Sequence, residues 1–177
     1  QRQMCIRDRY GIMAVNSAKD VPFHAAQSFR WWRLAVYVYV PALILTVVSS
    51  LLKWDATVTE AAKANNIEVS AAQTSLAVSF AFAILAQTAT AIACWWLAGK
   101  LLEGSTAART VLSVAAAVFV INASMTLVGT ISQVRSGDSS VLGLITAGLL
   151  IVASIIAATA TAQSYRGERN QKFFVTT

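Results

Sequence analysis

Four long stretches of the chain contain no charged residue, and they constrain its fold more than any other feature. They are residues 34–52, 69–99, 110–134 and 139–165. The shortest would extend about 28 Å as an α-helix, close to the roughly 30 Å of a bilayer's hydrocarbon layer. It is also longer than the apolar segment of a signal peptide, which has about 7 to 15 residues. We therefore predict an all-α polytopic membrane protein whose four transmembrane helices form an antiparallel bundle, at about 34–52, 71–98, 107–133 and 140–164.

The composition supports a membrane class and argues against nucleic acid as a partner. Apolar residues make up 56% of the 177 residues and charged residues 12%, about half the usual charged share of roughly 25%. The net charge is +6. Nucleic-acid binding would need Lys and Arg gathered on a polar face, whereas here they lie between long uncharged blocks. We expect the bilayer to be the partner of this positive charge. Two interpretations stay open: the basic residues only set the orientation of the protein, or they also gather anionic lipids.

The positions of Lys and Arg predict the orientation, because cytoplasmic connections are enriched in them. One side of the predicted membrane would hold Arg2, Arg7, Arg9, Lys19, Arg30, Arg33, Lys100, Arg109, Arg166, Arg169 and Lys172. The other side would hold Lys53, Lys63 and Arg135. We expect both termini to be cytoplasmic, in the cytoplasmic membrane of a bacterium.

Aromatic residues flank the same blocks and agree with this orientation, since amphipathic rings prefer the headgroup level. Together with neighbouring basic residues they are predicted to be interfacial anchors: Arg30, Trp31, Trp32, Arg33, Trp54, Trp95, Trp96, Lys100, Arg109, Tyr165, Arg166 and Arg169.

The segments outside the four blocks are short. We predict an interfacial segment over 13–33, with a short helix capped at Asp20-Val-Pro22, and a cytoplasmic tail over 166–177. An external helix over about 58–64 would begin at the capping box Thr57-Val-Thr-Glu60 and end at Asn65-Asn66. The capping box Ser70-Ala-Ala-Gln73 would start the second span. The segment Glu103-Gly-Ser-Thr106 would form the turn that caps the third span. Ser139 or Ser140 would cap the fourth.

Two segments carry a resemblance. The first nine residues, QRQMCIRDR, resemble a translated sequencing adapter, so we expect 1–12 to be a non-native leader and Met13 the natural start. The connection from Gly99-Lys100-Leu101-Leu102-Glu103-Gly104 to Ala108-Arg109-Thr110-Val111-Leu112 resembles small four-span integral membrane proteins of high-GC Gram-positive bacteria. This second resemblance covers about a dozen residues and implies no activity.

The spans contain no acid, base or metal ligand. Intramembrane ionisable residues mark transport pathways and catalytic sites, and all Asp, Glu, Lys, Arg and His residues fall outside the four blocks. His24 is the single histidine, and Cys5 and Cys94 belong to no C-x-x-C pair. We therefore expect no enzyme, no catalytic or metal-binding residues and no cofactor.

Neutral polar residues remain at membrane depth. Gln87 and Asn122 lie near the middle of their spans, and both amides should point away from lipid. Two interpretations stay open: hydrogen bonding between helices, or a polar site for a small solute. The residues concerned are Gln87, Thr90, Asn122, Ser124 and Thr126.

Small residues predict how the helices pack. Ala89 and Ala93, Gly143 and Ala147, and Ser154 and Ala158 have the four-residue spacing that lets helix backbones approach. We expect the second and fourth spans, which are richest in Ala and Gly, to lie at the centre of the bundle. The first span, with Tyr37 and Tyr39, should face lipid and be kinked at Pro41.

These features favour a non-enzymatic accessory, assembly or regulatory subunit that acts through a protein partner or as a homo-oligomer. The alternative is a channel or facilitator for a small neutral or hydrophobic solute. It predicts that Gln87 and Asn122 face one shared cavity.

Overall fold

The computed structural model describes residues 21–136 and 141–175, apart from a few side chains near the ends of helices. The elements in these ranges are helices: α2 (Phe23–Leu52), α3 (Trp54–Asn65), α4 (Val69–Leu101), α5 (Thr106–Ser136), α6 (Val141–Ser164) and α7 (Glu168–Val175). Four of them, α2, α4, α5 and α6, are long and apolar enough to cross a membrane. The predicted all-α bundle of four long helices is confirmed. The leader at 1–12, Asp20 and the caps at Ser139 and Ser140 lie outside the described residues.

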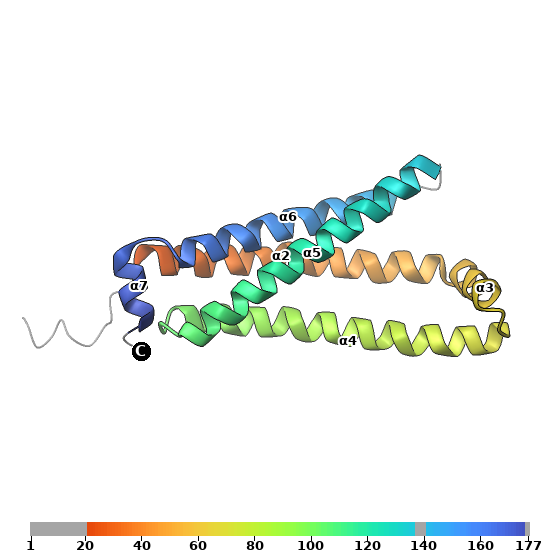
Figure 1. Ribbon diagram of the computed structural model, residues 1–177, viewed down its shortest axis with the longest axis horizontal. Helices are drawn as coiled ribbons and strands as arrows, with labels where there is room; N and C mark the ends of the chain where they lie inside the picture. The colour runs from red at the N-terminus through yellow and green to blue at the C-terminus, as the bar shows by residue number, and fades with distance from the viewer. Residues whose placement is uncertain (1–20, 137–140, 176–177) are drawn as a thin grey trace, which may run out of the picture.

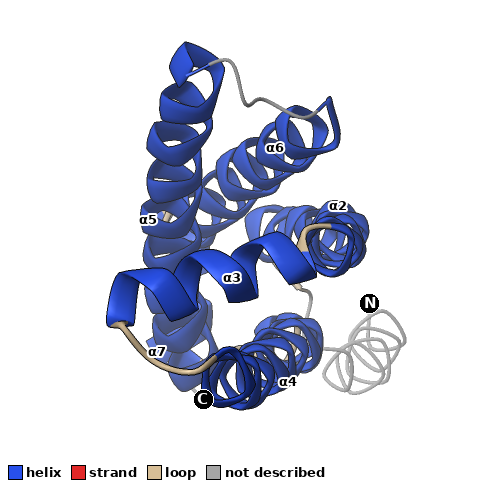
Figure 2. Cartoon of the chain, turned by 90° about the vertical axis from the view of Figure 1, so that its right-hand side faces the viewer, coloured by secondary structure: helices blue, strands red, loops and turns tan. Residues whose placement is uncertain are grey.

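The four long helices alternate in direction, and the two short helices mark opposite ends of the bundle (Figure 1). The α3 helix crosses from the end of α2 to the start of α4, as the view onto this end shows (Figure 2). We call this the α3 end and the opposite one the α7 end. The most extensive contact is between α2 and α6; α5 packs against α6, and α4 packs mainly against α2. From their shared turn, α4 and α5 diverge toward the α3 end.

Several helices begin at other residues than the sequence predicted. The interfacial segment and the first span form one helix, α2, which runs through Pro41. Thr57 does not cap α3, because the helix already begins at Trp54 and the Thr57 hydroxyl donates to the Lys53 carbonyl oxygen. Likewise α4 begins at Val69, before the expected cap at Ser70. Two signals are confirmed: Ser105 Oγ accepts from the Ala108 N–H at 3.3 Å, and α3 ends at Asn66 with φ 53°.

A continuous core fills the α7 half of the bundle. Small residues of α2 and α6, including Ala25, Ala35, Ala157 and Ala160, are fully buried at their contact. The Ser28 hydroxyl donates to the Ala160 carbonyl oxygen at 2.7 Å across this contact. Small side chains let two helix backbones come close enough for such a bond.

The predicted position in the bundle, central or peripheral, is wrong for two of the helices. Only 6% of the most apolar window of α4 is buried, and Ala89 and Ala93 are exposed. In contrast, Trp32 and Tyr39 of α2 are buried against Phe119 of α5. Large rings fill the space between diverging helices, which alanines cannot, so α2 occupies the centre together with α6. The central position expected for the fourth span is correct.

Two arginines at the α7 end are held between aromatic rings. The Arg33 guanidinium lies 4.5 Å from the ring centre of Phe29 and 4.4 Å from that of Trp95. The Arg109 guanidinium lies 4.4 Å from the ring of Tyr165 and 4.9 Å from that of Phe174. The latter pair fastens α7 to the start of α5, since guanidinium groups are attracted to aromatic faces. Thr106 strengthens this attachment by donating its hydroxyl to the Phe174 carbonyl oxygen at 2.7 Å.

Candidate functional site

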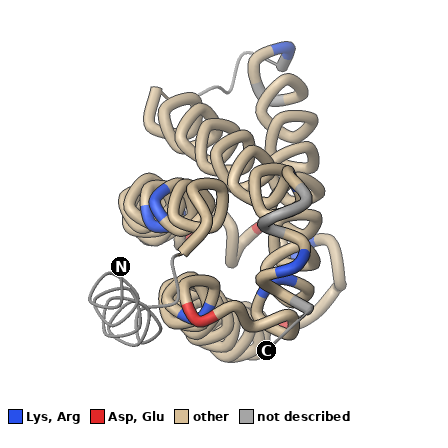
Figure 3. Tube along the Cα trace, turned by 90° about the vertical axis from the view of Figure 1, so that its left-hand side faces the viewer, with Lys and Arg blue, Asp and Glu red and all other residues tan. Residues whose placement is uncertain are grey.

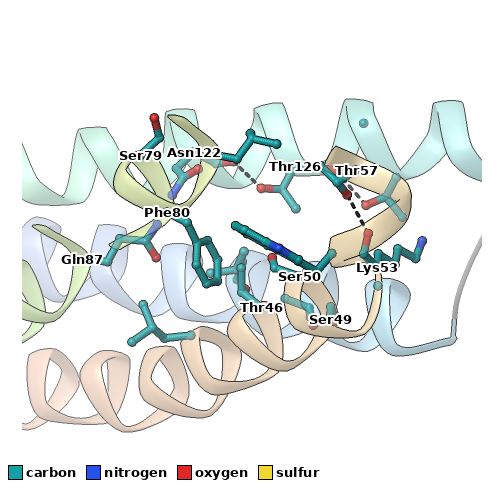
Figure 4. Close-up of a pocket in the computed structure, with 18 of the residues that line it drawn as sticks. Thr46, Ser49, Ser50, Lys53, Thr57, Ser79, Phe80, Gln87, Asn122 and Thr126 are labelled. Atoms are coloured by element: carbon teal, nitrogen blue, oxygen red, sulfur yellow. Dashed lines mark hydrogen bonds between the residues drawn. The ribbon is translucent and has the colours of Figure 1, made fainter. Parts of the chain in front are cut away.

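The α3 half of the bundle contains an open-sided cavity of about 680 Å³ (Figure 4), and some of its lining residues, among them Ser79, Asn122 and Gly129, are exposed. Its volume is within the range of about 300 to 1,000 Å³ that is typical of ligand pockets. All four long helices and α3 contribute to its wall. The lining residues are Tyr39, Leu43, Thr46, Ser49, Ser50, Lys53, Trp54, Thr57, Leu76, Ser79, Phe80, Gln87, Asn122, Thr126, Gly129, Thr130, Gly143, Thr146 and Leu150.

The two mid-span amides line this same cavity. Gln87 comes from α4 and Asn122 from α5, and both side chains point into the space between these helices (Figure 4). The Tyr39 hydroxyl donates to Gln87 Oε1 at 3.4 Å, so the oxygen of this amide is engaged and its NH₂ group remains for a ligand. No hydrogen bond joins the Asn122 amide to another side chain within 21–136 or 141–175.

Threonine hydroxyls along the wall face the cavity as acceptors. The hydroxyls of Thr46, Thr126, Thr130 and Thr146 each donate to the carbonyl oxygen four residues earlier, at 2.8 to 2.9 Å. A hydroxyl that has given its hydrogen away still has free lone pairs. These four residues therefore leave hydrogen-bond donation at the deep end of the cavity to the two amides.

Ser49 differs from the threonines, because its Oγ is buried without a hydrogen-bonding partner. It lies near the end of α2, closer to the α3 end of the cavity than the amides are. A buried hydroxyl without a partner is costly. The Ser49 hydroxyl is therefore a second polar group on the wall, besides the amides, that could bond to a ligand.

Aromatic and aliphatic side chains make up the rest of the wall. Trp54 at the start of α3 and Phe80 of α4 have ring centres 5.8 Å apart, and both line the cavity. The α3 helix is held there by Val58 and Ala62, which are buried against Ala72 of α4. This arrangement closes the α3 end of the space between α2 and α4.

The α7 end of the cavity is closed by the core. One to two turns beyond the cavity, each long helix presents buried residues to the bundle axis: Val36 on α2, Cys94 on α4, Phe119 on α5 and Ala153 on α6. The cavity therefore does not extend through the bundle to the α7 end.

The lining is almost uncharged. Lys53 is its one charged residue, and the Lys53 side chain extends away from the cavity (Figure 4). Carboxylates, imidazoles and guanidiniums are absent from this set of lining residues. The chemistry that the cavity offers is therefore neutral hydrogen bonding combined with apolar contact.

Three of the five predicted polar residues come together in the cavity: Gln87, Asn122 and Thr126. Thr90 and Ser124 do not, because they lie on exposed helix faces and donate to Ala86 and Val120 of their own helices. Helical spacing accounts for this split, since Asn122 and Thr126 are four residues apart and share a face.

Sequence reasoning missed Tyr39, Ser49, Phe80 and Gly129 as cavity residues. A signal existed for Ser49, since it lies within the polar pair Ser49-Ser50 close to the end of an apolar span. Phe80 and Gly129 are common residues in membrane helices, and nothing in their sequence neighbourhood indicates which way they face.

The predicted anchors lie at the two ends of the bundle. Trp54 is at the α3 end, and Trp31, Trp95, Trp96, Lys100, Arg109 and Tyr165 are at the α7 end with Arg30, Arg33 and Arg166. Trp32 is the exception: only 1% of it is exposed, so it packs in the core instead of reaching the interface. Arg169 belongs to α7, and its side chain lies outside the described part.

No protein family matches this chain, and no curated protein or solved structure matches it either.

Proposed function

We propose that this protein is an integral membrane protein that binds a small neutral or hydrophobic molecule in the cavity, and acts as a facilitator for it. One observation carries this proposal: the two amide side chains that lie deep within the spans of α4 and α5, Gln87 and Asn122, line a single cavity. Gln87 also accepts a hydrogen bond from Tyr39 of α2, but amides that served only to join helices would be expected to have no cavity between them.

The character of the lining supports a neutral ligand. Ligand pockets are mostly apolar and contain a few polar groups that fix the orientation of the ligand. The cavity has this composition, with Trp54, Phe80 and Leu150 among its apolar residues and two amides at its deep end. Because the core closes the α7 end, passage of a solute would require the helices to rearrange after binding.

We also propose that the α3 half of the bundle, which holds the cavity, lies toward the outer side of a bacterial cytoplasmic membrane. Most Lys and Arg residues of the described part lie at or near the α7 end, the end that faces the viewer in Figure 3, together with the start of α2 and with α7. Cytoplasmic segments carry an excess of Lys and Arg, which supports a cytoplasmic α7 end with both termini. An accessory role in a protein complex remains a prediction.

A cavity-filling substitution tests the proposal. Gly129 lines the cavity, and a Cβ atom there would meet nothing within 4 Å. We expect Gly129→Leu to fold normally, because leucine has a higher helix propensity than glycine, and to lose binding of tetralin, a neutral apolar probe. Binding is measured as the rise in unfolding temperature of the purified protein, since a ligand stabilises the native state that it binds.

Gly148→Leu is the matched control. A Cβ atom at Gly148 also meets nothing within 4 Å, but this residue is not in the cavity lining. The control should respond to tetralin as the wild type does. Equal responses of the Gly129 and Gly148 variants would show that the probe binds elsewhere, and the proposed function would be wrong.

A further inference from the structure

We infer that the ligand of the cavity is an uncharged apolar molecule that carries a hydrogen-bond-accepting carbonyl group, held at the deep end by Gln87 and Asn122. This inference rests on the proposed function and adds the chemical class of the ligand. Its basis is the balance between donors and acceptors in the cavity.

The two amides present unpaired donors. Gln87 Oε1 accepts from the Tyr39 hydroxyl, and its NH₂ group has no partner among the described residues. Asn122 lies across the cavity on α5, and its amide also points into the same space (Figure 4). Two amides from different helices thus line the same cavity.

An N–H donor without a partner is costly in apolar surroundings, with a penalty of about 1 to 3 kcal/mol. The nearby threonine hydroxyls do not donate into the cavity, because Thr46, Thr126 and Thr130 give their hydrogens to their own helices. They do not compete with the amides for an acceptor on the ligand. A ligand oxygen at the deep end would therefore receive its hydrogen bonds from Gln87 and Asn122.

The surroundings exclude charge as the recognised feature. A cationic ligand would find no carboxylate in the lining, and an anionic one would find only Lys53, which lies at the α3 end with its side chain directed away. The ligand group should therefore accept hydrogen bonds without carrying a charge. A carbonyl oxygen does so, since it is uncharged and can accept two hydrogen bonds. The aromatic rings of Trp54 and Phe80 provide an apolar surface for the rest of the molecule.

Two probes of nearly equal shape test this inference. 1-Tetralone and tetralin share a fused-ring skeleton and differ in a single carbonyl oxygen. We expect the wild-type protein to bind the ketone on the order of tenfold more tightly, as one net hydrogen bond of about 1 to 1.5 kcal/mol predicts. Dissociation constants come from the dependence of the unfolding temperature on probe concentration.

Near-isosteric apolar variants identify the residues responsible. Gln87→Met and Asn122→Leu remove the donors and keep the side-chain volume, so the fold should be retained. Each is expected to abolish most of the preference for the ketone, measured as the ratio of the two dissociation constants within the same variant. Thr90→Val, on an exposed face, is the control and should keep the preference.

The outcomes separate the two proposals. If both probes bind equally well and Gly129→Leu abolishes both, the cavity is a binding site but the inferred ligand class is wrong. The ligand class is equally wrong if the ketone is preferred and both amide variants retain that preference. If neither probe binds, or if Gly129→Leu leaves binding intact, the proposed function itself fails and this inference with it.

Discussion

Replacing Trp32 with alanine is expected to lower the free energy of unfolding by about 3 to 5 kcal/mol, the usual cost of removing a fully buried aromatic side chain. Trp32 is 1% exposed and belongs to the core formed by α2, α4, α5 and α6. Its ring centre lies 6.3 Å from that of Phe119. The helices cannot close the resulting space completely, because their contacts on either side hold them apart. Chemical or thermal unfolding in detergent measures this loss.

Trp96→Ala is the matched control for this prediction. Trp96 is in a neighbouring helix at the same end of the bundle, but it is 63% exposed and lies outside the core; its ring is 5.6 Å from Lys100 Nζ. Its replacement should change the stability by less than about 1 kcal/mol. An equal effect of the two substitutions would mean that Trp32 is not part of a packed core.

Replacing Phe174 with alanine is expected to release α7 from the bundle. Phe174 is fully buried, and its ring is one of the two faces that hold the Arg109 guanidinium. Loss of a buried phenylalanine costs about 3 to 5 kcal/mol, most of which would appear as local opening of this short helix. Amide hydrogen exchange over residues 168–175 should become faster on the order of a hundredfold.

The remaining helices should be protected as before in this variant, since α7 contacts only the ends of its neighbours. Phe82→Ala provides the comparison, because Phe82 is 73% exposed on α4. It should leave exchange in α7 unchanged. If Phe174→Ala also left α7 protected, the attachment of this helix would depend on other contacts, such as the bond from Thr106.

The number and approximate extent of the long helices can be predicted from the sequence because they depend on a local property. A stretch without charges that is long enough to cross a bilayer is recognisable on its own. The resulting predictions for α2, α4, α5 and α6 agree with the structure. The α2 helix begins at Phe23, ahead of the predicted span, because a charged residue does not by itself end a helix. Here Arg33 lies within α2, where Phe29 and Trp95 cover its charge.

Which helices occupy the centre cannot be predicted from small residues alone. Small side chains permit close approach but do not require it, so the alanine-rich α4 lies at the periphery with Ala89 and Ala93 exposed. The position of α2 depends on which residues of other helices its large side chains pack against. Tyr39 stacks on Phe119, with ring centres 4.9 Å apart, and this pairing joins residues that are far apart in the sequence.

Part of the candidate site can be predicted from the sequence, because that part depends on a local property of single residues. A neutral amide in the middle of an apolar span avoids lipid, which is enough to select Gln87 and Asn122. Their convergence depends on the rotation of α4 and α5 about their axes, which tertiary packing determines. The cavity between them also arises from the divergence of these helices toward the α3 end (Figures 1 and 2).

Chemical cross-linking across the cavity tests the central claim most directly, namely that Gln87 and Asn122 face one shared space. The chain would carry Gln87→Cys and Asn122→Cys in a background without Cys5 and Cys94, and would be treated with a short bifunctional thiol reagent. We expect one reagent molecule to join the two cysteines within a single chain, as intact-mass measurement would detect. The control pairs Gln87→Cys with Ile121→Cys. Ile121 is adjacent to Asn122 but is 63% exposed and does not line the cavity. This pair should give two separate adducts. Separate adducts in the 87/122 pair, or cross-links of equal yield in both pairs, would contradict the shared cavity.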